Sequence, residues 1–178
     1  MNVISNFFKS NTVRTILSYI LIIVVVVLIR MFIFDPVRVD GTSMDTTLKS
    51  GEIMILNKIY YRKNDIKRFD IIVIDEGDRD LIKRVIGLPG ETIAYRKNKL
   101  YINGEEISDP YPSTKTDDFR IESIGFTKIP NDSYFVMGDN RAVSADSRVS
   151  EIGVIKKSKI KGRAKLVIWP IKKFGFVK

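Results

Sequence analysis

The chain has 178 residues, which is enough for one domain with a membrane anchor and too few for two full domains. It contains no cysteine and no histidine, which excludes disulfides, thiolate or histidine metal sites, and catalytic groups such as the Ser-His-Asp triad. The formal net charge of +9 is scattered among acidic residues, which favours a surface near anionic lipid over a nucleic-acid partner.

The first predicted element is an apolar segment from Thr15 to Phe34, which has 20 residues and one charged side chain, Arg30. As a helix it would be about 30 Å long, the thickness of the hydrocarbon core of a bilayer. Arg30 lies near its end, where a long cationic side chain can reach the membrane surface. No small-residue cleavage site follows, which argues against a cleavable signal peptide. We therefore expect residues 15–34 to form a retained transmembrane helix in the cell membrane.

The orientation follows from the charges beside this segment. The tail of residues 1–14 carries Lys9 and Arg14 and no acidic residue, so we expect it to stay in the cytoplasm. Residues 35–178 would then form an extracytoplasmic catalytic domain of a single-pass protein.

The residues after the apolar segment form short β-rich runs between turn signals, without sustained helical periodicity. Asn103-Gly104 separates Lys99–Ile102 from Glu105–Ile107 and is a strong signal for a two-residue hairpin. Gly77 is expected to turn one strand back into the next. The other predicted strands are Glu52–Leu56, Asp70–Ile74, Asp80–Ile86, Thr92–Tyr95, Tyr134–Met137 and Ile160–Trp169.

Many short strands with close turns predict a mostly β protein, whose domain is an antiparallel sandwich or barrel-like fold behind a single transmembrane helix. Residues 108–133 contain three prolines among polar residues, and we expect them to form a loop or insertion.

Three polar, turn-rich stretches interrupt the β pattern, at residues 41–44, 83–90 and 138–148. Each one alone could be an ordinary surface loop or an edge-strand charge. Two chemical features favour a site instead. Gly41 lets the backbone beside Ser43 approach a ligand closely. Lys83 has apolar sequence neighbours, and burial of an amine lowers its pKa, so Lys83 could be a base that activates a serine hydroxyl without histidine.

In this order, the three motifs resemble those of bacterial type I signal peptidases, the leader peptidases that use a serine–lysine dyad. The similar residues are Ser43-Met44 with Thr47-Leu48, KRVIGLPG at 83–90, GDNRAVSADSR at 138–148, Trp169-Pro170 and Phe174-Gly175. The resemblance runs from about residue 29 to the C-terminus and is to the short Gram-positive form with one span. It implies a membrane-bound serine endopeptidase that removes signal peptides from secreted precursors, cutting after small residues (Ala-x-Ala).

The resemblance also implies the roles of the catalytic residues. Ser43 would attack the scissile carbonyl, and Lys83 would take its proton and later pass it to the leaving amine. The Ser144 hydroxyl would hold the Lys83 amine in line. The Ser43 N–H would contribute to an oxyanion hole. Gly41 stands where other family members carry a serine that adds a second donor, which leaves that donor open.

Two ion pairs are implied as supports of the site, Asp146 with Arg148 and Asp139 with Arg84. One position departs from the family pattern Ser-Met-x-Pro-Thr-Leu, because Thr46 stands where proline is usual. Loss of a proline costs about 1 kcal/mol or less through the entropy of the unfolded chain. Since Thr46 removes no catalytic atom, we expect an active enzyme.

Two alternative functions share parts of this pattern. A catalytically impaired membrane scaffold of the same fold would bind signal peptides without cleaving them, and Thr46 would fit relaxed constraint. A self-cleaving repressor with the same dyad is disfavoured by the apolar segment and by the lack of a DNA-binding helical region.

The expected partners are signal-peptide-bearing precursor proteins and the lipid bilayer, and not nucleic acid. An extended peptide could add to an exposed strand edge and place alternate side chains in shallow apolar pockets. The residues expected to line these pockets are Val39, Leu48, Leu81 and Ile82. The sequence implies no cofactor and no metal, because it has no metal-ligand cluster and no phosphate-binding glycine loop.

Overall fold

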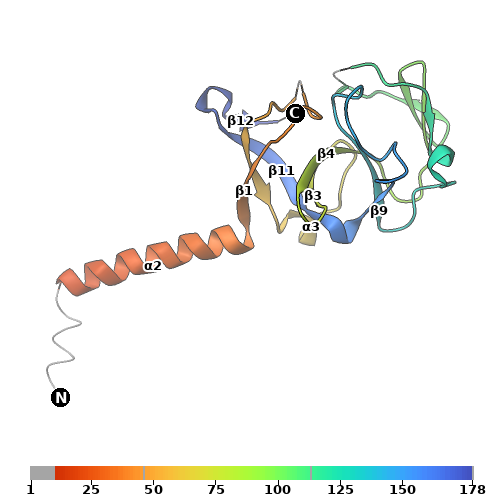
Figure 1. The fold of residues 1–178 in the computed structure, drawn as a ribbon. Coiled ribbons are helices and arrows are strands. Elements are labelled where there is room, and N and C mark those ends of the chain that lie inside the picture. Colours follow the sequence, from red (N-terminus) through yellow and green to blue (C-terminus); the bar gives the residue numbers. More distant parts are fainter. Residues whose placement is uncertain (1–10, 46, 113, 178) are drawn as a thin grey trace.

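The computed structural model describes residues 11–45, 47–112 and 114–177, and it consists of a long helix followed by a domain of short strands (Figure 1). The helix α2 (Asn11–Phe32) has 22 residues, none of them buried by the domain. An 18-residue stretch of it has a mean hydropathy of 2.7 and its whole length is about 33 Å, so it is long and apolar enough to cross a bilayer. The predicted segment was 15–34, and residues 1–10 of the predicted tail lie outside the described residues.

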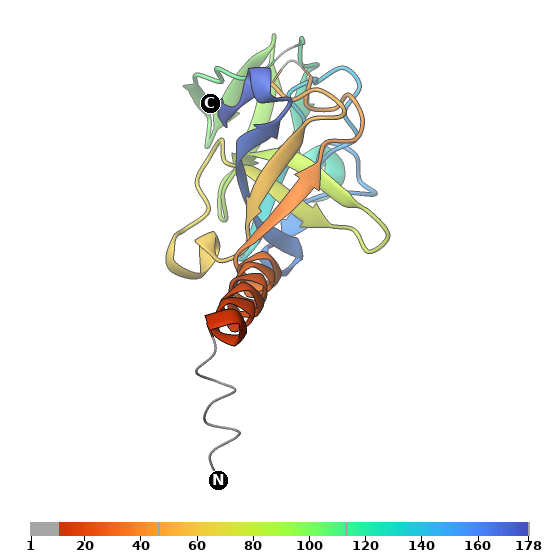
Figure 2. The same ribbon diagram turned by 90° about the vertical axis from the view of Figure 1, so that its left-hand side faces the viewer.

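Strand β1 (Phe34–Arg38) leads from the end of α2 into the domain (Figure 2). It forms one edge of the larger of two antiparallel sheets. The strand order in this sheet is β1, β2 (Ile53–Asn57), β11 (Ile160–Trp169), β3 (Ile71–Asp75), β4 (Asp80–Gly87), β9 (Ser133–Met137) and β10 (Ile155–Lys156), and β12 (Gly175–Phe176) pairs with β11.

Strand β4 changes partners along its length. Residues 80–84 pair with β3, whereas β9 pairs only with residues from Arg84 onward. Within the described part of the chain, the edge of residues 80–83 that faces away from β3 therefore has no strand partner. The outer edge of β1 is open in the same way, because β1 pairs only with β2.

The smaller sheet has the order β7 (Glu105–Ile107), β6 (Lys99–Ile102), β5 (Ile93–Arg96) and β8 (Phe119–Arg120). The predicted hairpin is confirmed, because β6 and β7 pair around Asn103 and Gly104. These two residues have φ values of +52° and +87°, as a type I′ turn requires. Residues 108–133 were expected to form a loop, and they include β8 and the 3₁₀ helix η1 (Ile121–Ile124).

Alternating side chains decide which face of each strand is buried. Along β2 every second residue is buried, and these side chains pack with Val73 of β3 and Ile82 of β4. Met44 and Leu48, from the turns after β1, belong to the same apolar cluster. Burial of a side chain such as Leu48 contributes roughly 2 kcal/mol, so this cluster anchors the loop that carries Ser43.

The mostly β, antiparallel fold behind an apolar helix is confirmed. The predicted strands correspond to β2, β3, β4, β5, β9 and β11 with ends that differ by one residue at most. Strand β1 was not predicted, because Asp35 and Pro36 interrupt its apolar pattern. The remaining short elements are α3 (Tyr60–Lys63), η2 (Lys157–Lys159) and η3 (Ile171–Lys173).

Candidate active site

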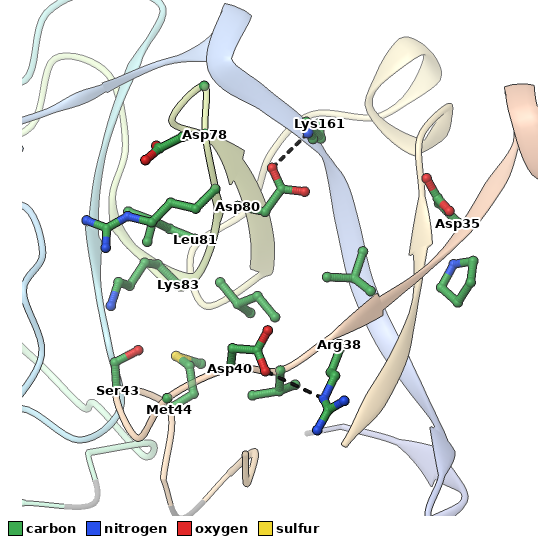
Figure 3. A pocket seen from close by; sticks show the side chains of 17 residues that line it. Asp35, Arg38, Asp40, Ser43, Met44, Asp78, Asp80, Leu81, Lys83 and Lys161 are labelled. Atoms are coloured by element: carbon green, nitrogen blue, oxygen red, sulfur yellow. Dashed lines mark hydrogen bonds and ion pairs between the residues drawn. The ribbon is translucent and has the colours of Figure 1, made fainter. Parts of the chain in front are cut away.

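A groove of about 710 Å³ lies between β1 with the segment that follows it and the first half of β4 (Figure 3). Both open strand edges described above border this groove. Ser43 and Lys83 line it together, although they are 40 positions apart in the sequence. Figure 3 shows the Lys83 amine and the Ser43 hydroxyl at the same end of the groove.

Ser43 is partly buried and lies in a turn just after β1. Gly41 precedes the turn with a φ of +95°, in the left-handed region that favours glycine, which is why the chain can bend sharply there. The Ser43 carbonyl accepts a hydrogen bond of 3.0 Å from the Asn140 N–H, so the loop of residues 138–148 lies against this turn.

Lys83 is held on β4, where it pairs with Ile72 of β3, and only 3% of it is exposed. Its Nζ donates to the Ser144 Oγ at 3.0 Å, and among the described residues no hydrogen bond joins it to Ser43. Burial lowers the pKa of the Lys83 amine from 10.5 to about 8. The Asp146 carboxylate opposes this shift, and the Arg148 and Arg79 cations add to it.

Arg84, the next residue on β4, forms a buried two-point ion pair with Asp139. Its Nε and one terminal nitrogen donate to the two carboxylate oxygens at 2.8 and 2.7 Å, and the side chains are 1% and 0% exposed. The guanidinium also lies 3.8 Å from the centre of the Tyr111 ring and donates to the Phe69 carbonyl. This pair ties the start of the 138–148 loop to the strand that carries Lys83.

The second expected pair, Asp146 with Arg148, lies inside the same loop. The Arg148 Nε and one terminal nitrogen donate to the two Asp146 carboxylate oxygens at 2.8 and 3.0 Å. Asp146 is fully buried and also accepts the Gly138 N–H at 3.1 Å. Arg148 donates to the Arg141 carbonyl at 2.7 Å. These bonds close the loop on itself around Ser144.

Three of the four expected pocket residues, Val39, Leu81 and Ile82, line the groove. Leu48 does not line it, because its side chain is fully buried in the apolar cluster beneath. Val37 and Met44 also line the groove and were not anticipated. Charged groups, among them Arg38, Asp40, Asp78, Arg79 and Asp80, border the groove.

Two residues of the loop make contacts that the sequence did not predict. Arg141 is fully buried and donates to Asp109 at 2.7 Å and to the Tyr95 hydroxyl at 2.8 Å, which joins the loop to the smaller sheet. Asn140 contacts the Ser43 turn through its backbone and its side chain. Both lie in the GDNR motif, which was the available signal, whereas Tyr95 has only the pattern of a strand residue.

Thr46, which departs from the family pattern, lies outside the described residues, so its effect on the Ser43 turn stays a prediction. In the ranges 11–45, 47–112 and 114–177, no group of three or more acidic residues could hold a metal ion.

Comparison with known proteins gives a consistent result. Residues 12–169 match the model of the family described as "Signal peptidase, peptidase S26". The chain is 42% identical over 163 residues to the signal peptidase I of Bacillus caldolyticus, covering 85% of this chain and 88% of that one. It is 38% identical to the signal peptidase I of Bacillus licheniformis, with 91% of each chain covered.

A solved structure is also similar. The crystal structure of a signal peptidase I from Enterococcus faecalis V583 superimposes with a TM-score of 0.51 at 36% sequence identity. The matched region covers 56% of this chain and 97% of the other.

Proposed function

Because this chain belongs to the signal peptidase family, peptidase S26, and is a serine endopeptidase of the signal peptidase I type, we propose that Ser43 is its nucleophile and Lys83 its general base. The observation that carries the proposal is the buried Lys83 amine with a pKa of about 8, at the end of the groove that Ser43 lines. At pH 7 about a tenth of such an amine is neutral and able to accept a proton.

The proposed reaction has two halves. In the first, the Ser43 Oγ attacks the scissile carbonyl while the Lys83 amine takes the hydroxyl proton, and the carbonyl oxygen becomes an oxyanion beside the Ser43 N–H. The C–N bond then breaks, and Lys83 returns the proton to the leaving amine. In the second half, water attacks the acyl ester with Lys83 again as base, which releases the acid and restores the Ser43 hydroxyl.

Ser144 would keep the Lys83 amine in place. It accepts one of the three protons of the ammonium form and fixes the direction of the amine at 3.0 Å. The ion pairs Asp139–Arg84 and Asp146–Arg148 would brace the loop that carries Ser144.

The substrate would be the extended end of a signal peptide that adds to the open edges of β1 and β4. The unpaired backbone groups of residues 80–83 can form main-chain hydrogen bonds with such a peptide. Val39, Leu81 and Ile82 would contact its alternate side chains, and shallow pockets beside them would favour small ones, as in Ala-x-Ala.

The helix α2 would anchor the protein as a single-pass membrane protein. Lys9, which precedes the helix in the sequence, and Arg14, in its first turn, would keep the N-terminus in the cytoplasm, so the groove would lie outside, near the membrane where precursors arrive. The comparisons give no support to a scaffold that binds signal peptides without cleaving them.

The test uses the full chain in detergent with a precursor whose signal ends in Ala-x-Ala. We expect Ser43→Ala and Lys83→Ala to lower cleavage at least about 10⁴-fold, because the two groups act as a unit. Below about pH 8, kcat/KM of the parent should fall about tenfold per pH unit, since protonated Lys83 cannot accept a proton.

Matched controls are Ser123→Ala and Lys99→Ala, which change an exposed serine and an exposed lysine of the smaller-sheet region. Both should cleave at the parent rate. Undiminished cleavage by Lys83→Ala would contradict the dyad, and equal cleavage of a precursor with Phe in place of both alanines would contradict the preference for small residues.

A further inference from the structure

Asn140 contacts both of the peptide groups that flank the Ser43 Cα. Its side-chain amide donates to the Thr42 carbonyl at 3.1 Å, and its backbone N–H donates to the Ser43 carbonyl at 3.0 Å. The φ and ψ angles of Ser43 lie between these two carbonyls, so the two bonds together fix its backbone conformation. We propose that Asn140 is a positioning residue that aims the Ser43 N–H at the substrate oxyanion, an inference that rests on the proposed role of Ser43.

The direction of this N–H follows from the geometry of a peptide group. The Thr42–Ser43 bond is trans, so its C=O and its N–H point in opposite directions. Asn140 holds the C=O, and the N–H therefore points to the side away from Asn140. Within the described ranges this N–H has no backbone partner, and Ser43 lines the groove. Such an N–H can donate to the charge that develops on the carbonyl oxygen.

Asn140 is itself held by a short chain of hydrogen bonds. The Thr114 hydroxyl donates to the Asn140 Oδ1 at 3.3 Å, and the Ala142 N–H donates to the Thr114 hydroxyl at 2.9 Å. The donors all point the same way, from Ala142 through Thr114 and Asn140 to the Thr42 carbonyl. Hydrogen bonds in a chain polarise one another, which makes the N–H at its far end, that of Ser43, a stronger donor.

The size of the effect follows from what remains after the amide is lost. Removal of a whole oxyanion donor costs about 10²–10³ in kcat. In Asn140→Ala the Thr42 carbonyl keeps a second bond of 3.1 Å from the Asp45 N–H, and the backbone bond from residue 140 to Ser43 also remains. We therefore expect a smaller loss, about 10-fold in kcat, while KM changes less than about twofold.

The experiment compares Asn140→Ala, Thr114→Val and the double variant in the full-length protein in detergent, with an Ala-x-Ala precursor. Thr114→Val should lower kcat less than Asn140→Ala, and the double variant should be no slower than Asn140→Ala alone, because Thr114 acts through Asn140. Thr114→Ser keeps the hydroxyl and should stay above Thr114→Val. The matched control is Asn64→Ala, which removes an amide that donates to the Tyr60 carbonyl, and neither residue lines the groove.

A second readout separates positioning from a general loss of structure. A peptide aldehyde ending in Ala-x-Ala forms a tetrahedral adduct with an oxyanion, so it should bind Asn140→Ala more weakly by the same factor as the loss in kcat. The acid limb of the pH profile should not move, because the Lys83 amine is untouched.

The outcomes distinguish this inference from the function on which it rests. If Asn140→Ala kept the kcat of the parent, or lost kcat with unchanged binding of the aldehyde, the positioning role of Asn140 would be overturned. The proposal that Ser43 is the nucleophile would still stand, provided that Ser43→Ala were inactive. Continued cleavage by Ser43→Ala would instead overturn the proposed nucleophile, and the role of Asn140 with it.

Discussion

Two charged regions flank Lys83, and they use the same residue types in different ways. In the loop of residues 138–148, Asp139, Arg141 and Asp146 are buried, and each makes at least two directed contacts. At the tip of the β3–β4 hairpin, Asp78 and Arg79 are exposed at the rim of the groove. The buried charges of the loop therefore hold its structure together, whereas Asp78 and Arg79 act on the site electrostatically through solvent.

A segment without β-strand pairing can hold catalytic groups in place when its buried charges are fully hydrogen-bonded. A buried charge is costly unless its hydrogen bonds are complete. In the described residues no buried side-chain nitrogen or oxygen lacks a partner, and the loop satisfies this condition with backbone N–H groups as donors and backbone C=O groups as acceptors. The hairpin needs no such contacts, because its position follows from the register of β3 and β4.

The largest effect is expected from removal of one member of the buried pair Arg84–Asp139. Asp139→Ala would leave the Arg84 guanidinium buried without its carboxylate, and we expect a loss of about 3–5 kcal/mol in the free energy of unfolding. Urea denaturation measures the change. The apolar pair Arg84→Met with Asp139→Leu should cost less than Asp139→Ala alone. If Asp139→Ala left the free energy of unfolding almost unchanged, the buried charges of the loop would contribute no more to stability than the exposed charges of the hairpin.

Gly138→Ala tests the packing between the loop and the Ser43 turn. A Cβ at this position would lie closer than any real Cβ contact to the Ser144 Oγ and to the Ser43 carbonyl oxygen. Both groups would have to move, and a displacement of about 1 Å at a reacting group costs about 100-fold in rate. We expect kcat for an Ala-x-Ala precursor to fall by that order.

The control for this change is Gly87→Ala at the end of β4. Its Cβ would press against the flexible ends of Ile129 and Ile93 in the apolar core, away from the groove. It should cost stability with little change in kcat. Equal losses of kcat in Gly87→Ala and Gly138→Ala would show that the loop packing has no special link to catalysis.

The sequence predicted the hairpin region better than the loop. Short runs rich in isoleucine and valine, together with Gly77, predict β3, β4 and the turn between them, because strand propensity and turn chemistry are local properties. The loop residues were found through the ordered motifs alone. The structure brings Ser43, Lys83 and Ser144 to one end of the groove, and their roles stay predictions.

The contacts that could not be predicted are polar and distant in sequence. The bond of Arg141 to Tyr95 and the bond of Asn140 to Thr42 join residues 46 and 98 positions apart. No local pattern encodes such a pair, because the tertiary fold decides which polar groups meet. Leu48 shows a different limit of sequence analysis. An apolar residue fits a substrate pocket as well as a core, and in the structure the Leu48 side chain is fully buried in the core.

The smallest effect is expected from a change at Arg79, at the tip of the β3–β4 hairpin. The Arg79 cation lowers the pKa of the Lys83 amine through space, whereas the Asp146 carboxylate raises it from within the loop. Asp146→Asn would also disturb the Arg148 pair and the Gly138 N–H, so it cannot isolate a field effect. Arg79→Gln removes a charge alone, and we expect it to raise the pKa of Lys83 by about 0.2–0.5 because the cation is exposed to water.

The sign and the salt dependence make this shift testable. A higher pKa keeps Lys83 protonated to a higher pH, so the acid limb of kcat/KM in Arg79→Gln should move toward higher pH, with the same rate at the plateau. Raising the salt concentration to about 1 M shortens the screening length to about 3 Å and should remove most of the difference between variant and parent. If the plateau rate of Arg79→Gln were below that of the parent at every salt concentration, Arg79 would make a direct contact in the enzyme–substrate complex. Arg79 would then act through directed contacts, as the charged residues of the loop do.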